Sequence, residues 1–271
     1  MNRIAQTFTR LKRQKRKALI GYVTAGFPDK ASLKRLVPLM EQSGVDLLEL
    51  GVPFSDPIAD GPTIQHSSQV ALAKGATLGW ILKSVKSLRH QGIQIPMILM
   101  SYANPIYAMG IEAFFRKAGE AGVDGLIIPD MIPEEAGPYA QAARRYGVDL
   151  IFLVSPTTLK PRIRWIAGKT HGFLYAVSLT GVTGVRKAVP ADTARFLKSV
   201  RTSCRTPIAV GFGLTTPQQV RDISSHADGV IIGSALIRKM EESQRTSFKG
   251  AAHFMRSLRR ALDEKEPSHA S

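Results

Sequence analysis

The sequence predicts a single (β/α)8 barrel with an extra helix at its N-terminus. Three observations support this fold class. The chain has 271 residues, close to the roughly 250 residues of a typical barrel of eight strand–helix units. A short junction recurs along the chain, and eight apolar runs alternate with helix-like segments. An open, doubly wound sheet is the alternative, but no G-x-G-x-x-G follows the first strand, which counts against its dinucleotide-binding version.

The recurring junction marks the passage from a helix to a strand. Its copies are Gly44–Asp46, Gly122–Asp124 and Gly147–Asp149, with a degenerate copy at His226–Gly229. Glycine adopts the left-handed conformation that ends many helices. The short apolar run that follows is typical of a strand buried on both faces. Repetition of helix, glycine, strand and loop therefore predicts parallel α/β units.

The elements follow one another without a linker. A basic helix within residues 1–17, at Arg3–Lys15, comes first, and the clearest later helices are Ala31–Ser43, Ile111–Ala121 and Pro133–Tyr146. The eight strand candidates are Ala18–Thr24, Leu47–Val52, Pro96–Tyr102, Gly125–Pro129, Asp149–Val154, Phe173–Leu179, Pro207–Gly213 and Gly229–Gly233. We expect residues 1–271 to form one domain with a frayed tail at 264–271.

Composition limits the class of protein. Hydrophobic residues make up 44% and charged residues 21%, as in an average soluble globular protein, so disorder is not the expected state. No apolar run approaches the roughly 18 residues of a membrane span, and the N-terminus lacks the apolar core of a secretory signal. The single cysteine, Cys204, excludes an intramolecular disulfide and a Cys-based zinc site. We expect a cytoplasmic protein without membrane association.

The net charge of +16 raises the question of nucleic acid binding. Residues 1–17 contribute +7, residues 238–271 contribute +3 and residues 18–237 contribute +6. We interpret the excess as the solvated face of a terminal helix and not as a groove of mixed basic and aromatic residues. Nucleic acid is therefore not expected as a partner, although a positive field can attract small anionic substrates.

The second strand predicts a carboxylate inside the barrel. Side chains alternate along a strand, so if Leu48 and Leu50 face the outer helices, Glu49 and Gly51 face the interior. A buried carboxylate is costly unless it is paired or protonated. An ion pair is the structural alternative, and the strand segments offer no obvious basic partner for Glu49.

The loop after this strand, Pro53–Thr63, adds further carboxylates. It is rich in proline and glycine and is not expected to be helical. It contains Asp56 and Asp60, and a loop at the mouth of the barrel can fold one of them over Glu49. Two carboxylates in different environments can serve as separate acid and base at neutral pH. Each aspartate can equally be a turn or cap residue.

Glycine-rich strand ends predict an anion site across the mouth. The seventh strand ends at Gly211–Gly213, the eighth runs through Gly233–Ala235 into a helix, and the loop after the sixth contains Gly181–Gly184. Helix N-termini bind anions, and the loops after strands seven and eight form the recurring phosphate site of such barrels. Glycine also simply makes turns, but three such ends at consecutive strands favour phosphate.

Other catalytic chemistries lack their residues. The six histidines are scattered and no His, Cys and Asp cluster has metal-ligand spacing, so no metal is expected. There is no G-x-S-x-G nucleophile elbow, and no strand end presents a lysine suited to a Schiff base. Carboxylate acid–base chemistry on a phosphorylated substrate remains.

One long segment resembles a known family. The run LELGVPFSDPIADGPTIQ at residues 48–65 resembles the signature segment of the tryptophan synthase alpha chain family. Three shorter segments add to the resemblance: MSYANP at 100–105, SLTGVTG at 178–184 and GFG at 211–213. The resemblance extends from about Ile4 to Leu262. The basic run Lys12–Lys17 and the tail after Leu262 depart from it.

The resemblance implies a reaction and the residues that perform it. The family cleaves indole-3-glycerol phosphate to indole and glyceraldehyde 3-phosphate, a retro-aldol step of L-tryptophan biosynthesis. Glu49 would move protons at indole C3 and at the glycerol hydroxyl, and Asp60 would take and stabilise the indole N–H proton. Independently of the resemblance, the loop Gly181–Ala188 is expected to close over the substrate, because it is rich in glycine and adjoins the phosphate site. The family's phosphate site corresponds to Gly184, Gly213, Gly233 and Ser234, and its indole pocket and loop closure to Tyr22, Leu99, Tyr102, Leu126, Phe152, Tyr175, Thr183 and Phe212.

The resemblance also implies a partner. It predicts no cofactor in this chain and an α2β2 heterotetramer with a beta chain that holds pyridoxal phosphate. The expected docking surface consists of two mouth loops, Pro53–Asp60 and Asn104–Tyr107, whose apolar side chains suit an interface core: Phe54, Pro57, Ile58, Pro105, Ile106 and Tyr107. The alternative is that these side chains pack onto their own barrel. Tyr175 can likewise be a barrel-core aromatic.

Two other functions stay open at this point. One is another phosphate-binding barrel enzyme, such as an isomerase acting on a related indole or ribose phosphate. The other is a non-catalytic or regulatory subunit, or a basic nucleic-acid binder. The presence of both Glu49 and Asp60 favours the lyase.

Overall fold

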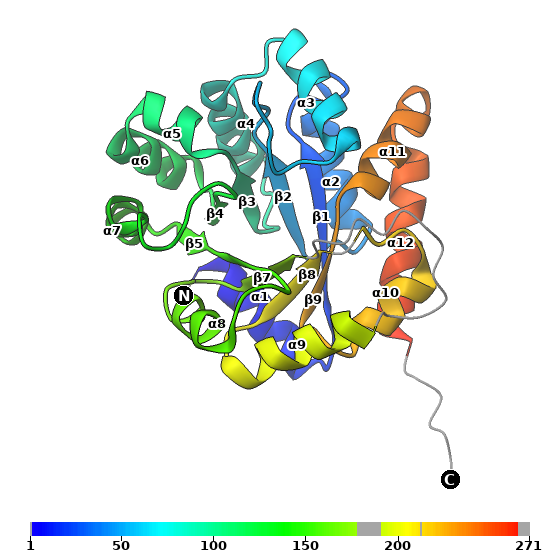
Figure 1. Ribbon diagram of the computed structural model, residues 1–271. Helices are drawn as coiled ribbons and strands as arrows, with labels where there is room; N and C mark the ends of the chain where they lie inside the picture. The colour runs from blue at the N-terminus through cyan, green and yellow to red at the C-terminus, as the bar shows by residue number, and fades with distance from the viewer. Residues whose placement is uncertain (1, 178–190, 212, 265–271) are drawn as a thin grey trace.

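The computed structural model describes residues 2–177, 191–211 and 213–264. In these ranges, helices alternate with parallel strands around a central barrel (Figure 1). The strands are β1 (Ala18–Thr24), β2 (Leu47–Gly51), β3 (Met97–Met100), β4 (Gly125–Ile127), β5 (Asp149–Ile151), β6 (Leu153–Val154), β7 (Leu174–Val177), β8 (Ile208–Gly211) and β9 (Gly229–Ile232). The helices are α1 (Arg3–Arg13), α2 (Ser32–Gln42), α3 (Pro62–Ala73), α4 (Leu78–His90), α5 (Ala103–Met109), α6 (Ile111–Ala121), α7 (Gly137–Tyr146), α8 (Lys160–Ala167), α9 (Ala191–Ser203), α10 (Pro217–Ser224), α11 (Ser234–Ser243) and α12 (Lys249–Asp263), with a short 3₁₀ turn η1 (Gln244–Thr246).

The sheet closes into the predicted barrel. Its strand order is β5-β4-β3-β2-β1-β9-β8-β7-β6, and all neighbours are parallel. The two ends of this order, β5 and β6, are separated in the chain by Phe152 alone. β5 pairs with β4 and β6 pairs with β7, so the fifth predicted strand is one bent stretch that completes the circle. At this bend the N–H of Phe152 donates to the Thr170 hydroxyl instead of to a strand.

Alternation along the strands separates two apolar clusters. Residues that face the barrel axis form the inner cluster. Its members on the strands are Ala18, Ile20, Leu47, Ile98, Ile127, Ile151, Ala209 and Ile231, and Phe173 joins them directly before β7. Their neighbours, such as Leu48 and Leu50, join a larger outer cluster with the surrounding helices. The basic N-terminal helix α1 completes the inner cluster with Ile4, Phe8 and Leu11. The ring of Phe8 lies 5.8 Å from that of Phe173, so α1 plugs the end of the barrel where the strands begin.

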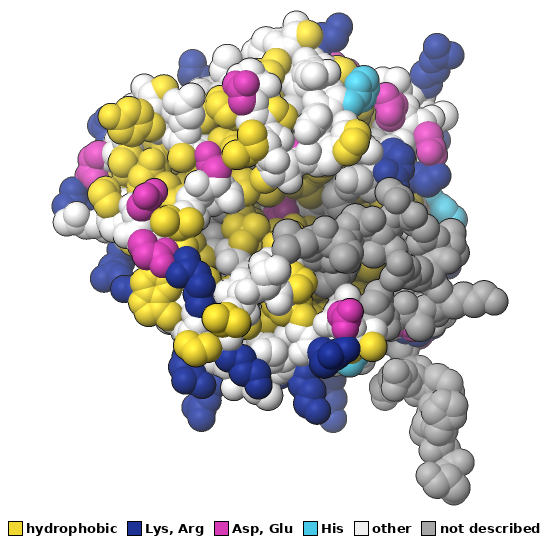
Figure 2. All heavy atoms as spheres, viewed as in Figure 1, with side chains coloured by type: hydrophobic (Ala, Val, Ile, Leu, Met, Phe, Trp, Pro, Cys, Tyr) yellow, Lys and Arg dark blue, Asp and Glu magenta, His cyan; other side chains and the backbone are white. Residues whose placement is uncertain are grey.

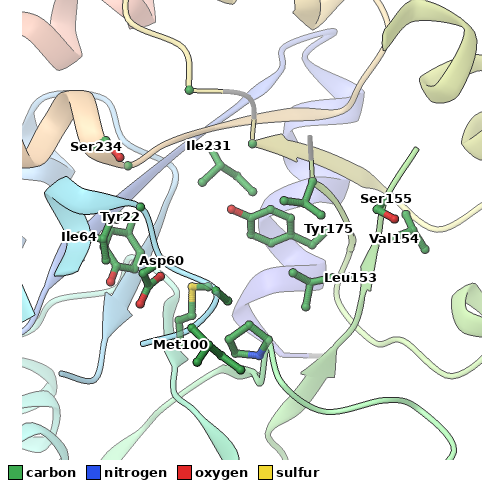
Figure 3. Close-up of a pocket in the computed structure, with 18 of the residues that line it drawn as sticks. Tyr22, Asp60, Ile64, Met100, Leu153, Val154, Ser155, Tyr175, Ile231 and Ser234 are labelled. Carbon is green, nitrogen blue, oxygen red and sulfur yellow. The ribbon is translucent and has the colours of Figure 1, made fainter. Parts of the chain in front are cut away.

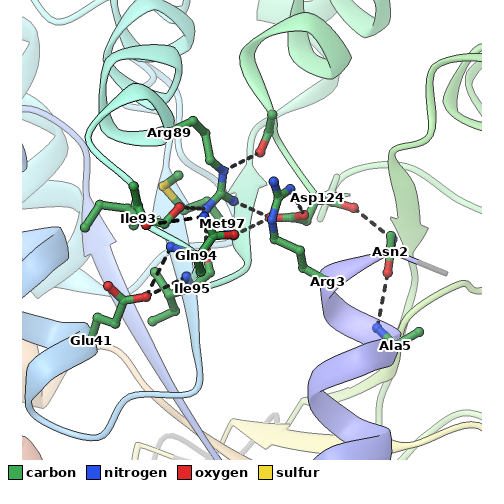
Figure 4. A network of polar contacts seen from close by, with 12 residues as sticks. Asn2, Arg3, Ala5, Glu41, Arg89, Ile93, Gln94, Ile95, Met97 and Asp124 are labelled. Atoms are coloured by element: carbon green, nitrogen blue, oxygen red, sulfur yellow. Dashed lines mark hydrogen bonds and ion pairs between the residues drawn. The ribbon is translucent and has the colours of Figure 1, made fainter.

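The aspartate of the recurring junction ties neighbouring strands together. Asp124, at the start of β4, accepts the N–H of Met97 on β3 at 2.8 Å. Its carboxylate also pairs with Arg89 of α4 and Arg3 of α1 (Figure 4). The same arrangement recurs at two other junctions: Asp46 with the N–H of Leu19 and with Arg259, and Asp228 with the N–H of Ile208 and with Arg201. The carboxylate supplies the acceptor that an N–H at the edge of the sheet would otherwise lack.

Two segments expected to be loops begin helices. Pro62 opens α3, where the missing N–H of proline has no partner to lose. Asn104–Tyr107 lies within α5, so the loop expected there was wrong. Asp130 stabilises the first turn of this helix by accepting the N–H of Ala103 at 3.0 Å.

Other elements begin or end at residues that differ from those predicted. The helix expected from Pro133 begins only at Gly137, directly before a proline in its first turn. Of the expected frayed tail, Glu264 pairs with Arg221 of α10, and 265–271 lie outside the described residues. The assignment of the whole chain to one domain stays a prediction. No helix in the described part of the chain is long and apolar enough to cross a membrane.

Candidate active site

A cavity of about 650 Å³ opens at the carboxyl ends of the strands (Figure 3). Its volume is typical of a small-molecule site. In the space-filling view it lies in the hollow near the centre of the face (Figure 2). Several of the predicted site residues line it: Tyr22, Asp60, Tyr175, Gly213, Gly233 and Ser234.

Glu49 lies on β2 and is fully buried. Its neighbour Leu47 belongs to the inner cluster and Leu48 to the outer one, so Glu49 faces the barrel interior as the alternation predicted. Its charge would act on Tyr22 and Tyr175, both of which line the cavity. The strand register pairs Glu49 with Tyr22, but Glu49 itself is not among the residues that line the cavity.

No described residue forms a hydrogen bond with either carboxylate oxygen of Glu49. Burial therefore acts without opposition and raises the pKa of Glu49 to about 8. A carboxyl group with such a pKa retains its proton at neutral pH and can donate it. The ion pair considered as an alternative is not formed with any described residue.

Asp60 is fixed at the rim by Tyr102. The Tyr102 hydroxyl donates to Asp60 Oδ2 at 3.0 Å and accepts the N–H of Ala59 at 3.0 Å. The ring of Phe54 stacks on the Tyr102 ring with 5.3 Å between centroids. Burial raises the pKa of Asp60, and the bond from Tyr102 partly opposes this effect. Two points of the loop after β2 are thus attached to one residue that follows β3.

Two glycines leave space for the two tyrosines of the cavity. A Cβ on Gly51 would lie 2.0 Å from the Tyr22 hydroxyl, and a Cβ on Gly211 would lie 2.8 Å from the Tyr175 hydroxyl. Figure 3 shows Tyr22 beside Asp60, with Tyr175 facing them across the cavity. Burial raises the pKa of both phenols, so both are neutral donors at physiological pH.

The expected phosphate side is formed by Gly213, Gly233 and Ser234, which line the cavity. Helix α11 begins at Ser234, and its N-cap Gly233 supplies no side-chain hydrogen bond to the first turn. The first N–H groups of a helix have no partner within it and are suited to an anion. Three other predicted site residues lie outside the described residues: Gly184 of the phosphate site, and Thr183 and Phe212 of the indole pocket and loop closure. The predicted closing loop Gly181–Ala188 also lies outside them.

Some predicted pocket residues do not line the cavity. Phe152 is buried in the outer cluster together with Leu99 and Leu126, while Leu153 lines the cavity instead. Because side chains alternate, Leu153 shares the face of Ile151, and this signal was available in the sequence. The prediction missed other apolar lining residues as well: Ile64, Met100 and Ile231.

The expected docking surface is smaller than predicted. Ile106 is fully buried and packs in the outer cluster, so its expected exposure was wrong. Ile58 and Tyr107 are 82% and 74% exposed.

Among the described residues, no three His, Cys, Asp or Glu side chains are grouped so that they could hold a metal ion.

Comparison with known proteins decides the family. The family model of the tryptophan synthase alpha chain matches residues 8–265. The tryptophan synthase alpha chain of Geobacter sulfurreducens is 46% identical over 263 residues, which cover 97% of this chain and 99% of that protein. The chain belongs to the tryptophan synthase alpha chain family. The protein of the same name from Dehalococcoides mccartyi is 47% identical over 97% of this chain and 100% of its own length.

Solved structures agree with this family. The crystal structure of tryptophan synthase subunit alpha from Legionella pneumophila matches with a TM-score of 0.90 at 36% identity, over 97% of this chain and 99% of that chain. The resemblance of residues 48–65 to the family signature is thereby confirmed. Membership of the tryptophan synthase alpha chain family makes this protein a lyase of L-tryptophan biosynthesis (EC 4.2.1.20), which cleaves indole-3-glycerol phosphate.

Proposed function

We propose that Glu49 and Asp60 share the proton transfers of this retro-aldol cleavage. The observation that carries the proposal is the buried Glu49 carboxyl, whose oxygens have no hydrogen-bond partner among the described residues. With a pKa of about 8, it is protonated before the reaction and positioned to donate into the cavity. Asp60 lies at the rim with its Oδ2 bound to Tyr102, and its other oxygen can accept a hydrogen bond from substrate.

The steps balance without a further reactant. Glu49 donates its proton to indole C3. The positive charge that then develops on the indole nitrogen is stabilised by the Asp60 carboxylate, which accepts a hydrogen bond from the indole N–H. Glu49, now a carboxylate, accepts the proton of the glycerol hydroxyl. The C–C bond breaks as the aldehyde forms, its electrons return to the indole ring, and Glu49 is protonated again. One group with a pKa near neutrality can act first as acid and then as base.

The phosphate of the substrate would bind opposite these carboxylates. Gly213, Gly233 and Ser234 line that part of the cavity, and the start of α11 offers backbone N–H groups for an anion. We assign Gly184 to the same phosphate site, and Thr183 and Phe212 to the indole pocket and loop closure, on the family resemblance alone. Tyr22 and Tyr175 then border the space for the indole ring between the phosphate side and Glu49.

Indole release from the isolated chain tests these roles. Glu49→Gln and Asp60→Asn should each lower turnover by about 10²–10⁴-fold while circular dichroism shows an unchanged fold. Asp56→Asn is the matched control, because Asp56 lies on the same loop, is exposed and bonds only to Ser55 in the described structure. A decrease of only a few-fold in both active-site variants would overturn the acid–base assignment.

The partner of this chain is inferred to be a beta chain with pyridoxal phosphate, in an α2β2 complex in the cytoplasm. Exposed Ile58 and Tyr107 lie on neighbouring elements of the mouth, where an apolar set suits an interface core. Because Ile58 shares a loop with Asp60, docking there would restrict the loop to its active arrangement and raise turnover.

Co-elution with the beta chain and stimulation of indole release test this docking. Ile58→Asp should weaken both effects, and Asp56→Ala or Pro57→Ala should weaken the stimulation more than the basal rate. Leu159→Asp is the control, because Leu159 is 75% exposed but precedes α8. Absence of both co-elution and stimulation would overturn the docking and leave the lyase assignment intact.

A further inference from the structure

Two segments of the chain account for its entire net positive charge. Residues 1–17 contribute +7, and residues 160–205 contain ten Lys or Arg and one acidic residue, Asp192, for +9. Together they equal the total of +16, so the rest of the chain is neutral overall. The assignment of the excess to the terminal helix was therefore incomplete.

Helix α9 presents a row of cations to solvent. Arg195, Lys198 and Arg201 are exposed and follow one another at intervals of three residues, which places them near one another on the helix surface. Arg195 pairs with Asp192, and Arg201 pairs with Asp228. Lys198 has no acidic partner among the described residues. The row is thus only partly neutralised.

Helix α8 adds an exposed tryptophan between two cations. Trp165 is 41% exposed, and Arg162 and Lys169 lie over its ring, 5.8 and 5.9 Å from the ring centre. Arg162 also pairs with Glu134. Arg164, next to it in the chain, is exposed and has no acidic partner within the described structure. An exposed aromatic plane beside cations is a platform on which nucleic-acid bases stack.

A groove of about 680 Å³ connects the two helices. Its lining includes Lys160 of α8 and Arg195 and Lys198 of α9. The space-filling view shows Lys and Arg side chains along the lower edge of the molecule, where α8 and α9 lie in Figure 1 (Figure 2). Lys17, after α1, is half-buried, and its Nζ donates to the Ala227 carbonyl close to this surface.

We propose that this α8–α9 surface, defined by Lys160, Arg162, Arg164, Trp165, Lys169, Arg195, Lys198 and Arg201, binds single-stranded nucleic acid. The phosphate backbone of the strand lies along the groove, and one of its bases stacks on Trp165. Proteins that bind single strands without sequence preference combine these two features. An acidic protein would satisfy the cations but does not call for an exposed aromatic ring among them, and in a duplex the bases are already stacked on one another.

Fluorescence anisotropy of a labelled oligouridylate tests the proposal with the full chain. The affinity should fall as salt rises, with a slope in log–log form of about −0.7 for each phosphate contacted. The double variant Arg164→Glu/Lys198→Glu should lose about 10-fold or more at low salt. The matched control is Lys83→Glu/Lys86→Glu on α4. It makes the same change in charge at two exposed lysines without acidic partners in the described structure. It should change the affinity by less than about 3-fold, because salt screens charges that lie far from the bound strand.

A third variant separates stacking from charge. Trp165→Leu should weaken binding of the oligouridylate by about 5-fold or more but leave binding of heparin, a polyanion without bases, unchanged. Thermal unfolding midpoints equal to wild type show that each variant is folded. The proposal is overturned if the two double charge variants weaken binding equally, or if Trp165→Leu has no effect. It is also overturned if duplex RNA binds as tightly as the single strand. Tighter binding of polyglutamate than of the oligouridylate would overturn it in favour of an acidic protein.

Discussion

Replacing Glu49 by glutamine should stabilise the protein while it removes activity. The Glu49 carboxyl is fully buried, and its pKa is raised from 4.5 to about 8 by burial. In the unfolded chain the group ionises near its ordinary value. Between these two pKa values the unfolded state has lost the proton and the folded state still holds it, so the free energy of unfolding falls as pH rises.

The magnitude follows from the two pKa values. Each pH unit between 4.5 and about 8 lowers the free energy of unfolding by about 1.4 kcal/mol. From pH 5.5 to pH 7.5 the loss is therefore about 3 kcal/mol by the same relation. Below pH 4.5 the contribution of Glu49 is fully present, and above pH 8 no more is lost. Glutamine is neutral at every pH and lacks this dependence, so Glu49→Gln should gain stability relative to wild type as pH rises.

Urea unfolding of both proteins at several pH values between about 5.5 and 8 measures this difference directly. Glu120→Gln on α6 is the matched control, because it makes the same substitution at an exposed position and should keep the wild-type pH dependence. If the wild type and Glu49→Gln lose stability with pH in parallel, Glu49 does not hold its proton in the folded protein, and the acid role assigned to it fails with it.

Three further substitutions test neighbouring features. Tyr102→Phe removes the hydrogen bond that lowers the pKa of Asp60, so that pKa should rise and the acid limb of the kcat/KM profile should move to higher pH; an unmoved limb would refute the pairing. Gly51→Ala places a Cβ 2.0 Å from the Tyr22 hydroxyl. It should lower the free energy of unfolding, measured with urea, by about 1–3 kcal/mol and should also lower indole production. Wild-type values of both would mean that Tyr22 is free to move. Asp124→Asn leaves the arginine of α4 without its countercharge and should cost about 3–5 kcal/mol; a change under about 1 kcal/mol in urea unfolding would show that water compensates the arginine.

The fold could be predicted because one local pattern repeats. The copies at Asp46 and Asp124 each combine a helix-ending glycine with an aspartate that accepts an N–H from the neighbouring strand. Such a signal is local in sequence and needs no knowledge of distant contacts. The bend at Phe152 was not predictable in this way, because the hydrogen bond formed there goes to Thr170, 18 residues further along the chain.

The site was predictable only as far as alternation along a strand reaches. Alternation placed Glu49 inside the barrel, and applied to β5 and β6 it would also have chosen Leu153 over Phe152. The attachment of Asp60 to Tyr102 spans 42 residues and depends on how two loops meet, which no sequence period specifies. The burial of Ile106 likewise follows from the formation of α5, a short helix that its proline-containing sequence did not suggest.

Two buried carboxylates three residues apart show why position alone does not decide chemistry. Asp46 precedes β2 and accepts the N–H of Leu19 while Arg259, from the far end of the chain, pairs with it at 2.9 Å. Both partners oppose the effect of burial on the pKa of Asp46. At Glu49 burial is the one cause of the pKa shift, and no described residue opposes it. The same fold therefore satisfies a carboxylate where strands begin and leaves one unsatisfied in the barrel interior, and it is the missing partner that keeps the Glu49 carboxyl protonated at neutral pH.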